Sequence, residues 1–336
     1  MNSVDKRLLD VLERYIASGI EQQVDYEKFY LYSLITHSTA IEGSTITEVE
    51  NQLLFDEGIV AKGRSINEQM MNVDLRDAYI YGFEWAGKMQ PYTVDFLRQL
   101  SAMVMRRTGA KYSVIGGEFD SSQGDFRLCN VSAGVGGSSY LAFSKVSKAV
   151  ADFCEWLNAQ FATINRNDVA ACYRLSFEAH FRLVTIHPWV DGNGRTTRLL
   201  MNIVQRQLGL IPSIVSKENK GAYIQALIDS REVEDIAIIE DVMMSQHIEN
   251  LEFRILQYQK SLSDTVNNIV NDTVNNKQQQ LLVLISEQPH ATYDEYAMQL
   301  GVSRATVARN IKSFIAKGLI KRIGSDKNGF WEIIII

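Results

Sequence analysis

The sequence predicts a mainly α-helical protein with one β-hairpin in its middle and a small separate domain near its C-terminal end. The chain has 336 residues, of which 46% are hydrophobic, so two or three domains with sizeable cores are expected. Apolar residues recur three and four positions apart over most of the first 260 residues, which is the period of amphipathic helices. From Gln278 onward the pattern changes to short helices followed by two apolar strands.

Composition excludes several classes of protein. Charged residues make up 22% of the chain, an ordinary value for a globular protein, and the 4 prolines and 21 glycines exclude a collagen-like scaffold. The net charge of −6 argues against a protein that coats nucleic acid with its whole surface, although it leaves room for one basic module. The 3 cysteines form no Cys-x-x-Cys pair, so neither a disulfide framework nor a thiolate zinc site is indicated.

Neither a signal peptide nor a membrane span is recognised in the sequence, so we expect a soluble, cytoplasmic chain. Residues 1–13 are charged and lack the apolar core of a signal peptide. No apolar run approaches the roughly 20 residues that span a bilayer. We therefore expect no membrane partner.

The expected helices of the first part share the three-and-four spacing of apolar residues. They cover residues 4–16, 26–41, 67–86, 94–106, 146–161, 168–186, 220–229 and 234–259. A further helix is expected to begin at Glu48, because Thr47 can cap it while Glu50 occupies the third position of a capping box.

A segment rich in Gly and Ser interrupts this rhythm between residues 112 and 140. Within it, residues 125–131 and 139–143 are expected to form two short strands around a Gly-rich turn. A hairpin embedded in a helical protein is often a functional flap, and a plain surface loop is the alternative.

The C-terminal part begins after a change in composition. The pentapeptide DTVNN occurs at residues 264–268 and again at 272–276, which indicates a linker or a weak helical extension. Helices are then expected over residues 281–286, 293–300 and 304–317, the last capped by Ser303, followed by strands over 320–323 and 330–335.

The segment with the strongest chemical signal is HPWVDGNGRTTR, residues 187–198. A helix ends near Ile186, Pro188 prevents its continuation, and a Gly-rich turn leads into a new helix near Arg195. Backbone N–H groups at a helix N-terminus after such a turn form a cradle for anions.

Four side chains of this segment could bind phosphate, bind a metal ion or accept a proton beside the cradle. Arg195 and Arg198 lie three apart on one helical face and suit a polyphosphate. Asp191 is a hard oxygen ligand that suits Mg²⁺, and His187 has the intrinsic pKa of a general base. A solvated turn beside an ordinary histidine is the alternative; the presence of all four groups within twelve residues favours a functional site.

Position by position, this segment resembles the signature of the Fic family, HPFx(D/E)GNGRxxR. Trp189 stands where Phe is usual, a conservative change at an apolar position. The resemblance extends to His180-Phe181 and Ile186 upstream, and residues 124–127 with the strand after them resemble the family's flap, which clamps a target segment by strand addition. It implies a Fic-type helical core with a β-hairpin flap.

The resemblance also implies an activity: transfer of AMP from ATP to a Ser, Thr or Tyr hydroxyl of a protein. His187 would deprotonate this hydroxyl, Asp191 would hold Mg²⁺, and Arg195 and Arg198 would contact the β- and γ-phosphates. The full set of positions implied to contact the nucleotide is Glu42, Asp191, Gly192, Asn193, Gly194, Arg195, Thr196, Arg198 and Tyr223. For Tyr223, an ordinary core aromatic is an equal alternative to a position near the nucleobase.

Residues 38–43, STAIEG, fit the family's inhibitory pattern (S/T)xxxE(G/N). A carboxylate from Glu42 aimed at Arg198 would occupy the partner of the γ-phosphate and leave the α-phosphate misaligned. Ser38, one helical turn earlier, would steady Glu42. A solvated glutamate is the alternative, and a reverse, hydrolytic removal of AMP by the same glutamate stays open.

The C-terminal module resembles a winged helix-turn-helix. Residues 277–336 carry eight basic and five acidic residues, a net charge of +3. Arg304, Arg309 and Lys312 fall on or near the expected recognition helix, with Lys321 and Arg322 beside the wing, so DNA binding is one interpretation. Because +3 is small for phosphate-driven binding, a protein-interaction or dimerisation module is slightly favoured.

These observations predict an autoinhibited Fic-type protein adenylyltransferase, with an unidentified target protein or with itself as target. A DNA-binding regulator whose Fic domain senses nucleotide or modifies itself is the alternative, and an enzyme that moves another phosphate-containing group ranks third. The expected parts are a helical extension with the inhibitory helix over 1–92, the Fic domain and following helices over 93–260, a linker over 261–277 and the winged helix over 278–336.

Overall fold

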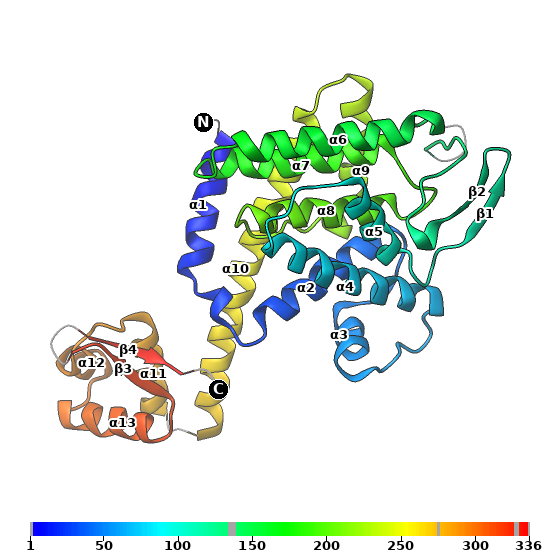
Figure 1. Ribbon diagram of the computed structural model, residues 1–336. Coiled ribbons are helices and arrows are strands. Elements are labelled where there is room, and N and C mark those ends of the chain that lie inside the picture. Colours follow the sequence, from blue (N-terminus) through cyan, green and yellow to red (C-terminus); the bar gives the residue numbers. More distant parts are fainter. Residues whose placement is uncertain (1–2, 134–138, 274–275, 326–328, 335–336) are drawn as a thin grey trace. The chain divides into compact units, whose positions relative to one another are not determined.

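The computed structural model describes residues 3–133, 139–273, 276–325 and 329–334 (Figure 1). The chain divides into two compact units, residues 1–253 and 254–336. Each unit has its own hydrophobic core, and each is described by itself.

The first unit is built of helices, apart from one two-stranded sheet. Its elements in chain order are α1 (Ser3–Ala17), the 3-10 helix η1 (Ile20–Gln22), α2 (Tyr26–Ile41), α3 (Glu48–Glu57), α4 (Ile66–Gly87), α5 (Val94–Val104), β1 (Lys111–Val114), β2 (Gly117–Asp120), the 3-10 helix η2 (Ser121–Gln123), α6 (Phe143–Thr163), α7 (Val169–Ile186), α8 (Asn193–Gln207), the 3-10 helix η3 (Lys217–Asn219), α9 (Lys220–Glu232) and the first part of α10 (Ala237–Thr273). The predicted helices are confirmed to within a few residues at their ends, and Thr47 with Glu50 forms the predicted capping box.

The predicted position of the hairpin is wrong. The hairpin is β1 and β2, upstream of the segments predicted as strands, and it projects from the helical body (Figure 1). Tyr112 stacks on Phe119 across it at 5.1 Å, and Gly117 takes a φ of 125° where the chain reverses. Among the described residues, the predicted strands 125–131 and 139–143 are joined by a backbone hydrogen bond from Tyr140 to Val131, next to an isolated bridge between Ser132 and Ser139, and they form no longer ladder; the residues between them at 134–138 lie outside the described residues.

In segment 125–131, hydrogen bonds of Arg127 to residues distant in the sequence take the place of pairing with a second strand. The N–H of Arg127 donates to the carbonyl of Pro188 at 3.0 Å, and its guanidinium donates to carbonyls nearby. Backbone groups satisfied in this way need no second strand.

The helix α8 forms the centre of the first unit. It packs against α7, α4 and α5, and Figure 1 shows it among them. The predicted apolar side of this helix is fully buried, with no exposed area on Leu199, Leu200, Ile203 or Val204. A Cβ at Gly82 would overlap the Ile203 side chain, so glycine there allows α4 to approach α8.

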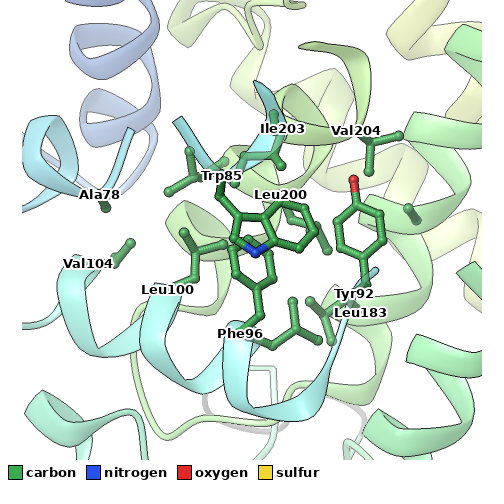
Figure 2. Packing of buried hydrophobic residues seen from close by; sticks show 14 of the residues in the cluster. Ala78, Trp85, Tyr92, Phe96, Leu100, Val104, Leu183, Leu200, Ile203 and Val204 are labelled. Atoms are coloured by element: carbon green, nitrogen blue, oxygen red, sulfur yellow. The ribbon is translucent and has the colours of Figure 1, made fainter. Parts of the chain in front are cut away.

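Aromatic side chains fill the space beside α8. The ring of Trp85 stacks on Phe96 at 3.8 Å, and Tyr92 lies against both (Figure 2). The Tyr92 hydroxyl donates to the Gln207 side chain at 2.6 Å, so even the polar end of this cluster is satisfied. The helix that carries the central motif is therefore held by a dense core.

The second unit has the order predicted for a winged helix. It contains the end of α10, then α11 (Asn276–Glu287), α12 (Tyr293–Leu300), α13 (Arg304–Ala316), β3 (Ile320–Ile323) and β4 (Phe330–Ile333). Ser303 caps α13 as predicted, and β3 pairs antiparallel with β4. Because α10 is helical to Thr273, the segment predicted as a linker or weak helical extension takes the helical form up to that residue.

None of the helices within the described ranges is both long enough and apolar enough to cross a membrane.

A partly buried charge cluster joins α1, α7 and α10 within the first unit. Arg174 lies 2.6 Å from Asp5, 3.5 Å from Glu240 and 3.4 Å from Asp241. Burial raises the pKa of Glu240 to about 7, although Arg174 opposes the rise. The folded state therefore holds a proton on Glu240 that the unfolded state releases at lower pH.

We predict that Glu240→Gln changes how stability depends on pH. Because the pKa of Glu240 is raised in the folded state, its contribution is fully present below about pH 4.5 and is lost as pH rises toward 7. The glutamine variant should therefore gain melting temperature relative to wild type between pH 5 and pH 8, as measured by calorimetry. Asp241→Asn, at a more exposed partner of the same arginine, is the control, and an equal trend in both variants would contradict the assignment.

Candidate functional site

The motif 187–198 forms a turn that is fixed from both sides. Helix α7 ends at Ile186 because His187 takes the left-handed conformation, with φ of 53°. The Asn193 carboxamide accepts from Trp189 N at 3.1 Å and donates to Trp189 O at 2.8 Å. The buried indole of Trp189 donates to the Gly124 carbonyl at 3.2 Å. The turn is thus rigid, and α8 begins at Asn193, two residues before the predicted start.

The N-terminus of α8 has the geometry of an anion cradle. Gly192 caps it with a φ of 77°, and a Cβ at this position would lie 2.7 Å from the Met105 sulfur. The first N–H groups of a helix have no acceptor within the helix, and the helix dipole adds positive potential there. Because the Asn193 carboxamide is engaged with Trp189, the backbone N–H is the group of Asn193 that suits an anion.

Arg195 is buried beside this cradle with unused hydrogen-bond donors. Its side chain is 4% exposed, one terminal nitrogen lies 3.2 Å from the Met105 sulfur, and Asp191 lies 3.5 Å away. Within the described part of the chain, its Nε and its other terminal nitrogen have no hydrogen-bond partner. Burial lowers the pKa of Arg195. A buried guanidinium with free donors at a helix N-terminus is suited to bind an anion.

Arg198, one turn further along α8, is paired with the N-terminal helices. Its side chain is 3% exposed; it donates to Ser38 Oγ at 3.0 Å, Ser38 O at 2.9 Å and Glu42 Oε1 at 2.6 Å. Burial alone would lower the pKa of Arg198, but the Glu42 charge raises it overall, while Arg198 in turn lowers the pKa of Glu42 despite burial. The structure thus brings together Ser38, Glu42 and Arg198.

The Glu42 carboxylate lies directly against the first turn of α8. A Cβ built on Gly194 would overlap Glu42 Oε1 and would lie 2.8 Å from an Arg198 nitrogen. Glycine at position 194 therefore leaves the space that the carboxylate fills. An anionic group of this chain occupies the mouth of its own anion cradle.

A buried polar network fixes the end of α2 that carries Glu42. The Thr39 hydroxyl and the Asn51 amide both donate to Asn72 Oδ1 at 2.9 Å, and Asn72 Nδ2 donates to Ser44 Oγ at 3.2 Å. Thr39, Asn51 and Asn72 come from α2, α3 and α4 and have no exposed surface. Three helices thus hold Glu42 in place, a network that the sequence did not reveal because its members share no spacing.

His187 lies in a partly buried position suited to a base. Its Nδ1 is 3.3 Å from the Val184 carbonyl, which assigns the proton to Nδ1 and leaves Nε2 as the acceptor. Burial, assisted by the positive charges of Arg127 and Arg231, lowers the pKa of His187 to about 4. The imidazole is therefore neutral near pH 7. Tyr140 stacks on it at 3.8 Å between ring centroids.

The remaining predicted residues differ in exposure. The Asp191 side chain is 61% exposed, and its Oδ1 accepts from Gly192 N at 2.5 Å. Thr196 is buried, and its hydroxyl has no partner among the described residues. Tyr223 is buried too, with its hydroxyl 2.9 Å from His180 Nε2, so its surroundings resemble those of a core aromatic. Its contact with a nucleobase stays a prediction.

A cavity of about 350 Å³ is lined in part by Tyr140, whose ring stacks on His187. Its lining comes from the segment before α6, from the end of α7 and from α9, and consists of Ser139, Tyr140, Leu141, Thr185, Ile228, Arg231 and Glu232. Sequence reasoning missed Tyr140 and Arg231, as well as Met105 under the cradle, because no local pattern links them to the motif.

Comparisons with known proteins agree with this geometry. Residues 91–205 match the model of the Fic/DOC family, and residues 274–329 match that of the MarR family. "Protein adenylyltransferase Fic" of Drosophila melanogaster is 28% identical over 238 residues, which cover 68% of this chain and 44% of that protein. The protein of the same name from Drosophila willistoni is 30% identical over 57% of this chain and 35% of its own length. The chain thus spans less than half the length of these relatives.

Solved structures show the same fold. A Fic-domain-containing signaling protein from Bacteroides thetaiotaomicron has a TM-score of 0.62 at 19% identity and covers 76% of this chain and 97% of its own. A Fic family protein from Desulfovibrio desulfuricans has a TM-score of 0.61 at 17% identity and covers 99% of this chain and 97% of its own. The fold is therefore a mainly helical Fic domain followed by a winged helix. The likeness to the Fic/DOC family itself extends over residues 91–205.

We predict that Glu42→Gly tightens the binding of inorganic tripolyphosphate about tenfold, because the carboxylate no longer competes for Arg198 and the cradle. Isothermal titration calorimetry of wild type and variant measures the change. Glu57→Gly, at the exposed end of α3, is the matched control and should bind as wild type does. Equal affinity in Glu42→Gly and wild type would show that Glu42 does not obstruct the anion site.

Proposed function

We propose that this chain is a protein adenylyltransferase that transfers AMP from ATP to a hydroxyl side chain of a protein. The single observation that carries the proposal is a neutral, partly buried His187 beside a helix N-terminus flanked by two buried arginines. The names of the curated relatives support the same activity. No individual target protein follows from these features, and the chain itself is one candidate.

The proposed step uses each group in one role. Nε2 of His187 accepts the proton of the target hydroxyl, whose oxygen attacks the α-phosphorus of ATP. The bond from that phosphorus to the bridging oxygen breaks, and pyrophosphate leaves with its electron pair. Arg195 and the first N–H groups of α8 hold phosphate oxygens, and Arg198 holds the γ-phosphate. Positioning and charge neutralisation supply most of the acceleration in such reactions.

A magnesium ion fits this scheme at Asp191. The described residues contain no cluster of three or more metal-ligating side chains, and Asp191 presents one exposed carboxylate beside the cradle. Mg²⁺ commonly takes one or two carboxylates and completes its shell with phosphate oxygens and water. When bound, the ion neutralises charge on the phosphates; Asp191 holds it in place.

The ion pair between Glu42 and Arg198 supports autoinhibition. With Arg198 engaged by Glu42 and Ser38, the γ-phosphate lacks its partner, and ATP settles with its α-phosphate out of line with the attacking oxygen. Displacement of Glu42 would activate the enzyme. The same carboxylate is also placed to orient a water for removal of AMP, so a reverse activity belongs to the proposal.

We predict that His187→Ala, made in the Glu42→Gly background, abolishes transfer while ATP binding persists. The reason is that His187 acts on the attacking hydroxyl, whereas other groups form the cradle. Incubation with ATP labelled at the α- or the γ-phosphorus measures transfer, with circular dichroism as the fold control. Glu42→Gly alone should transfer label to protein from ATP labelled at the α-phosphorus and none from ATP labelled at the γ-phosphorus. Transfer of the γ-label would identify a kinase instead. AMP transfer that persists in the His187→Ala variant would show that His187 is not the base.

The winged helix supports a second candidate function, DNA binding by a regulator whose Fic domain senses nucleotide or modifies itself. The match to the MarR family favours it, and Arg309 and Lys312 are exposed on α13. Two other basic side chains of the winged helix form ion pairs with carboxylates: Arg304 lies 3.3 Å from Asp294, and Lys321 lies 2.5 Å from Glu332. These pairs weaken the case for phosphate contacts, and a protein-interaction or homodimer module is the alternative.

We predict that, if the DNA-binding proposal holds, wild type shifts duplex DNA in gels at low salt and Arg304→Glu with Arg309→Glu loses the shift. AMP transfer in the Glu42→Gly background should not change, because α13 belongs to the second unit. Absence of any shift by wild type at low salt would exclude DNA binding as a function of this unit.

A further inference from the structure

Arg127 is a buried arginine that the proposed mechanism does not use. Its side chain has no exposed surface. Its Nε donates to the carbonyl of His187 at 2.8 Å, and its terminal nitrogens donate to the carbonyls of Cys129, at 2.8 Å, and Leu141. Its own backbone N–H donates to the carbonyl of Pro188 at 3.0 Å. One residue thus joins the turn that carries the base to the backbone at Cys129 and at Leu141.

The surroundings of Arg127 contain carbonyl groups in place of a counter-charge. Among the described residues, the acceptors of its guanidinium are the carbonyls of His187, Cys129 and Leu141, and burial lowers the pKa of the guanidinium. Burial of an unpaired charge is costly, and an apolar side chain would fill the same space at lower cost. The geometry of its hydrogen bonds therefore indicates a task that an apolar residue would not perform.

The residue bound by Arg127 is under backbone strain. His187 has a φ of 53° and a ψ of 62°, a left-handed conformation that costs roughly 1–2 kcal/mol for a residue with a side chain. Such a conformation persists only where its surroundings hold it. The contact of Arg127 with the His187 carbonyl acts on one of the two peptides that define this conformation, and its contact with the Pro188 carbonyl holds the next peptide along the chain.

Tyr140, which precedes the Leu141 carbonyl bound by Arg127, touches the imidazole itself. Its N–H donates to the carbonyl of Val131 at 3.1 Å. The Tyr140 ring then stacks on His187 at 15° between planes, and the Arg231 guanidinium lies 5.1 Å from the Tyr140 ring centre. Arg127 thus holds the peptide of His187 and the backbone at Leu141, next to the Tyr140 ring that covers the imidazole.

We propose that Arg127 is a positioning residue: it fixes the peptide of His187 so that Nε2 faces the attacking hydroxyl, and it holds the backbone beside Tyr140, whose ring stacks on the imidazole. This inference rests on the proposed adenylyltransferase activity.

The charges that face His187 make the inference measurable. Arg127 and Arg231 lower the pKa of the imidazole, Glu42 raises it, and the Val184 carbonyl stabilises the protonated ring. Removal of the Arg127 charge should therefore move the pKa of His187 upward. A lysine at position 127 keeps the charge but reaches fewer carbonyls, so it separates the electrostatic effect from the positional one.

The test uses Arg127→Met and Arg127→Lys in the full chain with Glu42→Gly. Transfer of α-labelled AMP gives kcat and the KM for ATP, and the ring signals of the 5 histidines in NMR titrations give the pKa of His187 without any need for turnover. We expect kcat to fall about a hundredfold in the methionine variant and about tenfold in the lysine variant, at unchanged KM, because a displacement near 1 Å costs about that much. The pKa should rise in the methionine variant alone.

Several outcomes would overturn the inference. Wild-type kcat in Arg127→Lys, or a raised KM for ATP at constant kcat in either variant, would show that Arg127 does not position the base. If Arg127→Met does not fold, the kcat and KM of the lysine variant decide the matter. If Glu42→Gly itself transfers no AMP, the proposed adenylyltransferase function fails. Separately, an unchanged pKa of His187 in a folded Arg127→Met variant would exclude the proposed action of Arg127 on His187.

Discussion

The ion pair between Glu42 and Arg198 is the interaction on which the proposed function of this protein depends. It joins the N-terminal helices to the first turns of α8 at 2.6 Å, with the arginine 3% exposed. Removal of one partner of a buried pair leaves an uncompensated charge, so the arginine needs an anion at all times. In the proposed cycle that anion is the Glu42 carboxylate at rest and the γ-phosphate during transfer. The anchoring of Glu42 by Thr39 and Asn72 then sets how readily one replaces the other.

The arginines and the histidine of the candidate site are held by different parts of the structure. The arginines lie on α8, whose apolar side is part of the core and whose Asn202 is bonded to Tyr79 at 2.7 Å and to the Ser213 carbonyl at 2.9 Å. The histidine lies on the turn before α8, in a left-handed conformation. A site built on core helices keeps its phosphate contacts fixed, whereas the base is held and covered by Arg127 and Tyr140, which lie outside those helices.

Much of this architecture could be predicted from the sequence, because it follows from local rules. Helix periods, the capping boxes and the turn at 187–194 are properties of neighbouring residues, and the grouping of Ser38, Glu42 and Arg198 followed from a family pattern. The hairpin was misplaced because the Arg127 N–H and the Cys129 carbonyl are engaged by the motif turn and by the Arg127 guanidinium, contacts that no local pattern predicts. Asn72 and Met105 were missed because their partners are distant in sequence. Arg127 was placed in the flap by the family resemblance, but its contacts with backbone carbonyls were not foreseen, because any residue type can supply such an acceptor.

The central claim is that the Glu42 carboxylate withholds Arg198 from ATP. The most direct measurement compares the rate of AMP transfer from α-labelled ATP by wild type, Glu42→Gly and the double variant Glu42→Gly with Arg198→Ala. A hydrogen-bonded charge pair is worth about 1.5–3 kcal/mol, so Glu42→Gly should raise the rate roughly ten- to hundredfold. The double variant should lose this gain, because nothing then holds the γ-phosphate. An unchanged or lower rate in Glu42→Gly, with nucleotide still bound, would contradict the account.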